Sequence, residues 1–91
     1  MQTLEQIASI LNEDPNEIER EGIKAYLKQR LRDIDVEIYK IVKKYGIKDI
    51  FDMDEKLKEG KFEEENVRED YQRLDHLEFE RDKIKEALEK F

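Results

Sequence analysis

His76 is the only histidine in the chain, and carboxylates surround it in the sequence. Glu80 follows it by one helical turn, and Glu69, Asp70 and Asp75 precede it. Such a group could hold a catalytic metal ion. Metal centres in helical bundles, however, need Glu-x-x-His pairs and carboxylates on several facing helices, and no Glu-x-x-His pair occurs here. We therefore predict no metal site and no cofactor.

Residues for nucleophilic catalysis are equally sparse. Ser9 is the only serine, and no histidine-based arrangement can be argued around it. The sequence contains no Gly-rich phosphate loop, nucleophile elbow or zinc-ligand spacing. Cysteine is absent, which excludes disulfides and thiolate metal sites. We expect a protein that is not an enzyme.

Charge is abundant and unevenly distributed along the chain. Charged residues make up 47% of the sequence, and the net charge is −7. Residues 1–19 carry five acids and no Lys or Arg, whereas residues 20–48 carry nine bases against four acids. Residues 49–91 carry sixteen acids against nine bases. The basic middle segment is therefore expected to pack favourably against the acidic segment that follows it.

A basic run lies at the end of this middle segment, with Tyr39 and Tyr45 interleaved. It consists of Lys40, Lys43, Lys44 and Lys48. The run could bind a phosphate backbone, which leaves a nucleic-acid-binding regulator as the alternative function. Bases at the end of a helix also complement its dipole, and the acidity of the whole chain argues against a nucleic acid partner.

The longest expected element is a helix over residues 15–45. Asp14 suits its N-cap, Pro15 its first position and Gly46 its left-handed end. Apolar residues spaced three or four apart form one stripe along it, which we predict to be the core. The stripe consists of Ile23, Leu27, Leu31, Ile34, Ile38, Ile41 and Tyr45.

A thinner apolar face lies roughly opposite this stripe. It consists of Ile18, Ala25, Val36 and Tyr39. One stripe buries too little apolar surface to offset the ordering of so long a helix, so we expect contacts on two sides. We therefore predict this thin face to be a dimer or partner interface.

A second long helix is expected over about residues 63–91. Its heptad-spaced apolar residues predict a seam with coiled-coil character. Its main seam residues are Leu74, Leu77, Ile84 and Leu88. Arg81 interrupts the seam and could form an ion pair, set the register or reach a partner's carboxylate. We predict an antiparallel hairpin of the two long helices.

Two short helices complete the expected architecture. One covers residues 4–11, where Thr3 and Gln6 form a capping-box pattern, and the other covers residues 47–60, with Asp49 as its N-cap. The chain is thus predicted to be a single all-α domain of four helices over residues 1–91. It has no membrane-spanning run and no visible export signal, so we expect a cytoplasmic protein.

Residues 4–31 read LEQIASILN and then EDPNEIEREGIKAYLKQRL. This segment resembles the helical pair of ribbon-helix-helix antitoxins, and the remainder is similar to the charged helical tails with which small prokaryotic antitoxins cover a toxin. The resemblance implies an intertwined dimer and a toxin as partner. The family reads DNA with a strand before the first helix, and Met1 and Gln2 leave no room for one.

From these patterns we predict a small interaction protein that forms a homodimer and binds a protein partner through its amphipathic helices. The apolar faces of a long helix in so small a chain motivate this prediction.

Overall fold

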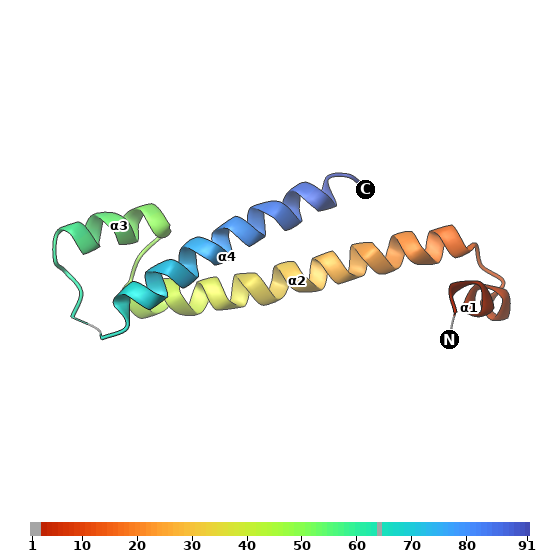
Figure 1. Ribbon diagram of the computed structural model, residues 1–91, viewed down its shortest axis with the longest axis horizontal. Coiled ribbons are helices and arrows are strands. Elements are labelled where there is room, and N and C mark those ends of the chain that lie inside the picture. The colour runs from red at the N-terminus through yellow and green to blue at the C-terminus, as the bar shows by residue number, and fades with distance from the viewer. Residues whose placement is uncertain (1–2, 64) are drawn as a thin grey trace.

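Helix α2, Pro15–Tyr45, is the longest element of the computed structural model, which describes residues 3–63 and 65–91. The other helices are α1 (Leu4–Leu11), α3 (Ile50–Lys58) and α4 (Val67–Leu88). Figure 1 shows α4 running back along α2, with α3 beside the closed end of this hairpin and α1 at the opposite end of α2. The described residues contain helices and no strand. The prediction of an all-α protein built on two long antiparallel helices is therefore confirmed.

Helix α2 begins and ends where its capping residues lie. The Asp14 side chain accepts a hydrogen bond of 2.9 Å from the backbone N–H of Asn16, and Pro15 occupies the first turn. Gly46 ends the helix with a φ of 62°, a left-handed conformation that glycine adopts without the penalty other residues face. These signals are local, which explains why the sequence predicted both ends of α2.

The core lies at the closed end of the hairpin, where α2, α3 and α4 meet. Met53, Leu74 and Leu77 are completely or almost completely buried there. The other buried members are Ile34, Ile38, Ile41, Tyr45, Ile47, Ile50 and Ile84. Most of the predicted stripe on α2 and of the predicted seam on α4 is therefore core.

The predicted core thins toward the other end of the hairpin. Leu27, Leu31 and Leu88 are only half-buried, although they pack against the cluster. Ile23 is 45% exposed, so its assignment to the core was wrong. Figure 1 shows α4 diverging from α2 toward the C-terminal end of α4, which is at Leu88. Beyond this end, the ring of Phe91 lies 5.3 Å from the guanidinium group of Arg20, so the hairpin widens here while still contacting the first turns of α2.

Two helix boundaries also differ from the prediction. Helix α4 begins at Val67 rather than near residue 63, and α3 covers Ile50–Lys58 rather than residues 47–60. Before α4, the ring of Phe62 packs edge-on against the ring of Tyr45, with centroids 5.1 Å apart. At α3, the Asp49 side chain accepts a bond from the N–H of Asp52 and so begins the helix, as predicted.

Four ion pairs join α2 to α4, two with the base on α2 and two with the base on α4. They are Arg30–Glu80 at 2.5 Å, Glu37–Arg73 at 2.8 Å, Lys44–Asp70 at 2.8 Å and Asp35–Arg81 at 3.8 Å. Exposed pairs of this kind contribute little stability individually, about 0–1 kcal/mol. Their regular succession favours one register of the hairpin over others.

Acidic pH should weaken the hairpin through Asp70. Burial raises the pKa of Asp70, but hydrogen bonds from Lys44 and Tyr45 outweigh burial and hold that pKa below its ordinary value. A carboxyl with a lowered pKa stabilises the folded state above its unfolded pKa and loses this contribution as the pH falls. We expect Asp70→Asn to flatten the loss of stability below about pH 4, measured by urea unfolding between pH 7 and pH 2. An unchanged pH profile in this variant would contradict the role of Asp70.

Glu78 of α4 fastens α3 to the hairpin. Its carboxylate accepts a bond of 3.0 Å from the backbone N–H of Ile50, in the first turn of α3. Burial raises the pKa of Glu78, and this backbone bond only partly offsets the effect. An uncharged acceptor should therefore serve almost as well as the carboxylate.

We expect Glu78→Ala to lower the free energy of unfolding by about 1 kcal/mol, because the Ile50 N–H loses its side-chain acceptor. Glu78→Gln keeps an acceptor and should be nearly neutral. Amide hydrogen exchange should show the loss mainly in α3. Equal destabilisation by both variants would indicate that the charge matters rather than the acceptor.

Candidate protein-interaction surface

The end of the molecule that carries α1 lies outside the packed part of the hairpin. The molecule extends 61 × 24 × 17 Å, and its radius of gyration of 19.2 Å far exceeds the ~12 Å of a compact chain of this length. All buried hydrophobic residues of the described segments belong to the cluster between α2, α3 and α4, except Ala8. This distribution leaves the α1 end with almost no core of its own.

Helix α1 exposes most of its apolar side chains. Ala8 is buried, but Ile7, Leu11 and Ile10 are 50%, 55% and 77% exposed. The predicted capping box does not form, because the Thr3 side chain makes no capping hydrogen bond and its buried hydroxyl has no partner among the described residues. A helix of eight residues is marginal in water without tertiary contacts. This one therefore has apolar surface available for a further contact.

A groove separates the end of α1 from the first turns of α2. Leu11 and Ile18 supply its apolar part. Its acidic rim consists of Glu13, Asp14, Glu17 and Glu21. An apolar floor with an acidic rim suits a segment that carries small or apolar side chains between lysines or arginines.

Charges at and along the first half of α2 are sorted by sign. Three acids spaced four residues apart are followed, three residues later, by three bases with the same spacing. They are Glu13, just before the helix, and Glu17, Glu21, Lys24, Lys28 and Arg32 within it, called here the charged side of α2. None of them has an ion-pair partner within residues 3–63 and 65–91, in contrast to the charges that face α4.

The predicted thin face of α2 is open to solvent along most of its length. Ala25, Val36 and Tyr39 are exposed, and Ile18 is half-buried beside α1. The ammonium group of Lys43 lies 5.8 Å from the centre of the Tyr39 ring. Helix α4 packs on the opposite stripe, so this face is accessible to a partner, and its role as an interface remains a prediction.

His76 and its surroundings do not assemble into a metal centre. Its Nε2 atom lies 2.9 Å from Glu80 Oε1, and Arg30 pairs with the other oxygen of the same carboxylate. Within the described segments, no group of three or more His, Asp and Glu side chains is placed to hold a metal ion. Glu80 instead links α4 to α2.

Arg81 lies within the hairpin rather than pointing to a distant partner. Its Nη1 atom is 3.8 Å from Asp35 Oδ1, and its buried Nε has no hydrogen-bond partner among the described residues. Its positive charge also opposes the rise in the pKa of Glu78. This geometry fits an ion-pair and register residue, one of the roles considered from the sequence.

The basic run at the end of α2 is partly occupied by contacts within the chain. Lys44 pairs with Asp70, and the backbone N–H of Lys48 donates to the Asp52 side chain. Asp52 has a lowered pKa, chiefly because of this bond from Lys48. Lys40 has no ion-pair partner among residues 3–63 and 65–91, and Lys43 only contacts Tyr39. The run therefore presents the ammonium groups of three lysines rather than four, because the bond from Lys48 uses its backbone and not its side chain.

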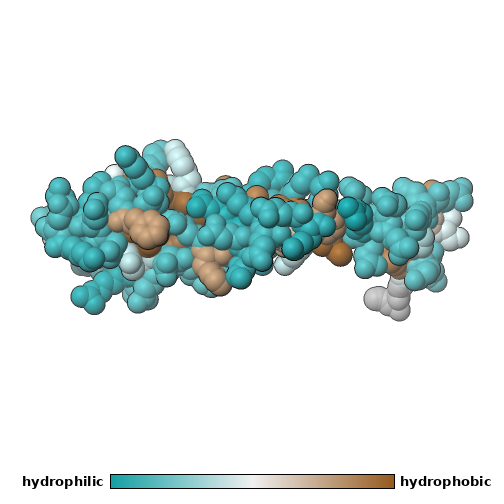
Figure 2. Space-filling view, turned by 90° about the horizontal axis from the view of Figure 1, so that it is seen from above, coloured by the Kyte–Doolittle hydropathy of each residue, from teal (hydrophilic) through white to brown (hydrophobic). Residues whose placement is uncertain are grey.

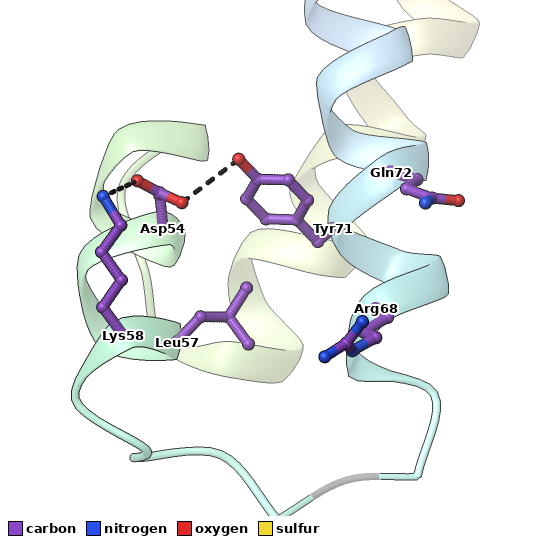
Figure 3. A pocket seen from close by; sticks show the side chains of 6 residues that line it. All are labelled: Asp54, Leu57, Lys58, Arg68, Tyr71 and Gln72. Carbon is purple, nitrogen blue, oxygen red and sulfur yellow. Dashed lines mark hydrogen bonds and ion pairs between the residues drawn. The ribbon is translucent and has the colours of Figure 1, made fainter.

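A second groove lies between α3 and the first turns of α4 (Figure 3). The Tyr71 hydroxyl donates a bond of 3.4 Å to Asp54, which also pairs with Lys58 at 3.1 Å. Burial and the charge of Asp54 raise the pKa of Tyr71, so its hydroxyl stays protonated at neutral pH. Leu57 and Arg68 also line this groove between α3 and α4.

Figure 2 shows a largely hydrophilic face with small, separate hydrophobic areas along its length. An interface of this molecule is therefore expected to combine limited apolar contacts with charge pairing, as non-obligate protein interfaces do. The sequence predicted the thin face but missed the exposed side chains of α1 and the groove. The exposed apolar residues of LEQIASIL were the available signal, because so short a helix cannot bury all of them against one neighbour.

The fold and this surface define an all-helical protein in which a long antiparallel hairpin carries an uncovered end. The chain belongs to the uncharacterized protein MJ0235 family, whose model matches residues 1–91. No curated protein and no solved structure matches the chain. None of the helices described is both long enough and apolar enough to cross a membrane.

Proposed function

We propose that this protein is a small, non-enzymatic interaction module that binds another polypeptide through its uncovered end. This end comprises α1 and the first half of α2. The observation that carries the proposal is the state of α1, an eight-residue helix with Ile7, Ile10 and Leu11 at least half exposed. Apolar side chains gathered on so small an element are typical of a surface that another chain covers.

The closed end of the hairpin supplies a rigid support for this surface. Its core and its ion pairs hold α2 straight against α4, so the uncovered half of α2 is presented as a preformed helix. Because this helix is already ordered, less conformational entropy is lost on binding than if the surface were a flexible segment. We also propose that α2 and α4 supercoil around each other, that the protein forms a homodimer and that it acts in the cytoplasm.

An antitoxin-like role is one form of this function. It follows from the resemblance of residues 4–31 to the helical pair of ribbon-helix-helix antitoxins, and it makes a toxin the partner. The acidic groove between Leu11 and Glu21 would then receive a basic segment of that toxin. A neighbouring gene that encodes a toxin-like ribonuclease would support this form.

Affinity capture with matched variants tests the proposal. The test variant is Ile7→Ser, Ile10→Ser, Leu11→Ser, and the control is Phe51→Ser, Phe79→Ser, which alters exposed side chains of α3 and α4. We expect the wild type and the control to retain the same partner, either a second tagged copy or another protein. The test variant should lose most of it, by roughly tenfold or more, because its apolar contacts are removed. Equal retention by all three proteins would contradict the proposal.

The alternative function is binding of nucleic acid by the basic part of α2. The observation that favours it is the set of lysines without ion-pair partners in the described chain, Lys24, Lys28 and Lys40. Binding should then appear at low salt, weaken steeply as salt is added and be lost in Lys24→Glu, Lys28→Glu. Absence of binding to DNA and RNA at low salt would exclude it.

A further inference from the structure

We propose that the partner of the uncovered end is a second copy of this chain, with the first halves of the two α2 helices antiparallel. This inference rests on the proposed function and names its partner. Three features of the described residues carry it: the charged side of α2, the groove beside α1, and Gly22.

The charged side of α2 is complementary to itself when one copy is reversed. Residues 13–21 contain five acids and one base, whereas residues 24–32 contain four bases and no acid. Two copies placed in parallel would set acids against acids and bases against bases. Two antiparallel copies set the acidic half of each against the basic half of the other, which is electrostatically favourable.

The spacing of these charges defines a register. In one register, the two-fold axis passes between Gly22 and Ile23, and every acid of the charged side then lies opposite a base of the other copy. This register places Glu13 opposite Arg32, Glu17 opposite Lys28, and Glu21 opposite Lys24, each on both sides of the axis. Charges three or four residues apart lie on the same side of a helix, so the Glu17–Lys28 and Glu21–Lys24 pairs form simultaneously. Glu13 lies just before the N-cap of α2 and adds its pair at the end of this stretch. The helical part of the paired stretch covers residues 15–32, about 27 Å of helix.

Several charges of α2 are already paired within the chain. Arg30, Glu37 and Lys44 of α2 pair with side chains of α4, whereas the six residues of the charged side have no such partner in the described segments. Arg30 lies between Lys28 and Arg32, so the charged side is unpaired although α4 still contacts this part of α2. The sorted order of its charges is what an antiparallel copy would neutralise.

The groove beside α1 faces the second copy in this register. Residues 24–34 of the second copy lie opposite residues 11–21 of the first. That segment presents Ala25 between Lys24 and Lys28, a small apolar side chain flanked by two cations. The groove offers Leu11 and Ile18 with an acidic rim, so its chemistry matches this segment.

Gly22 lies next to the proposed axis and permits a close approach. Ile18, Gly22 and Ala25 share the thin face of α2, on the side away from α4. A Cβ atom at Gly22 would meet nothing within 4 Å, so packing within one chain does not require glycine there. Glycine weakens a helix by roughly 1 kcal/mol relative to alanine, and contact between two α2 helices at this point accounts for it.

Charge reversal with complementation tests the pairing in the full-length protein. One variant carries Glu13→Lys, Glu17→Lys, Glu21→Lys, and the other carries Lys24→Glu, Lys28→Glu, Arg32→Glu. Sedimentation across a wide concentration range should show a wild-type dimer. Each variant alone should dissociate at roughly tenfold or more higher concentration, because its pairs become repulsive. An equimolar mixture of the two variants should form the dimer again.

A control with Glu55→Lys, Asp75→Lys, Asp82→Lys changes the net charge on α3 and α4 by the same amount as the first variant does, and it should dimerise as the wild type does. Gly22→Leu provides a test independent of charge. A Cβ atom at this position would meet nothing within 4 Å in one chain, and leucine favours a helix over glycine. Helix content measured by circular dichroism should therefore be retained or increased while association is lost.

Other outcomes would overturn the inference. Wild-type-like association of both charge variants, or a mixture that stays monomeric, would exclude this antiparallel register. A wild type that sediments as a monomer at all concentrations would exclude the second copy as occupant. In that case capture of a different protein that depends on Ile7, Ile10 and Leu11 would preserve the proposed function, and failure of that capture would remove both.

Discussion

Leu74→Ala is expected to lower the free energy of unfolding by about 2–5 kcal/mol, the range for truncating a fully buried leucine. Leu74 is completely buried in the cluster where α2, α3 and α4 meet. The molecule has no second core that could hold the hairpin together, since Ala8 is the only buried hydrophobic residue described outside this cluster. The loss is therefore expected to unfold much of a marginally stable chain, as urea or thermal unfolding will show.

Phe79→Ala is the matched control for this substitution. Phe79 lies on the same helix but is more than half exposed. The ammonium group of Lys83 lies 5.5 Å from the centre of its ring. Its truncation should change the stability by less than about 0.5 kcal/mol. Similar losses in the two variants would show that the core lies elsewhere than in the cluster around Leu74.

Removal of residues 1–12 should abolish association while leaving the hairpin folded. Of the large core residues, none belongs to α1, and Asp14 remains to cap α2. The free energy of unfolding of the hairpin should therefore change by no more than about 1 kcal/mol. Association should weaken by roughly a hundredfold or more, because the deletion removes Ile7, Ile10 and Leu11 and one wall of the groove.

Chemical unfolding and sedimentation of the same truncated protein separate these two effects. A truncated chain that associates as strongly as the full chain would contradict the part assigned to α1. A truncated chain that fails to fold would contradict the independence of the hairpin.

The sequence predicted those parts of the fold that depend on local signals. Asp14, Pro15 and Gly46 define the ends of α2, and Asp49 begins α3, because each acts on backbone groups within a few residues. The heptad spacing of Leu74, Leu77 and Ile84 identified the buried face of α4. These features need no knowledge of the rest of the chain.

Features that depend on where the second long helix ends were not predictable in the same way. Ile23 continues the apolar spacing of α2 without interruption, yet it is 45% exposed at the end where α4 diverges from α2. The contact of Phe62 with Tyr45 joins residues far apart in the sequence, and the spacing of apolar residues did not predict it. The unpaired charges of Glu17 and Lys28 likewise became meaningful only once the partners of the neighbouring charges were known.

Amide hydrogen exchange of α1 in the full-length protein tests the central claim most directly. If the uncovered end is an interaction surface, the amides of α1 should exchange at nearly unprotected rates in dilute solution, while those of residues 34–45 remain protected. Protection of α1 should then rise with protein concentration in step with association, or on addition of a captured partner. Strong protection of α1 in a dilute, monomeric sample, or no protection of α1 in any associated state, would contradict the account.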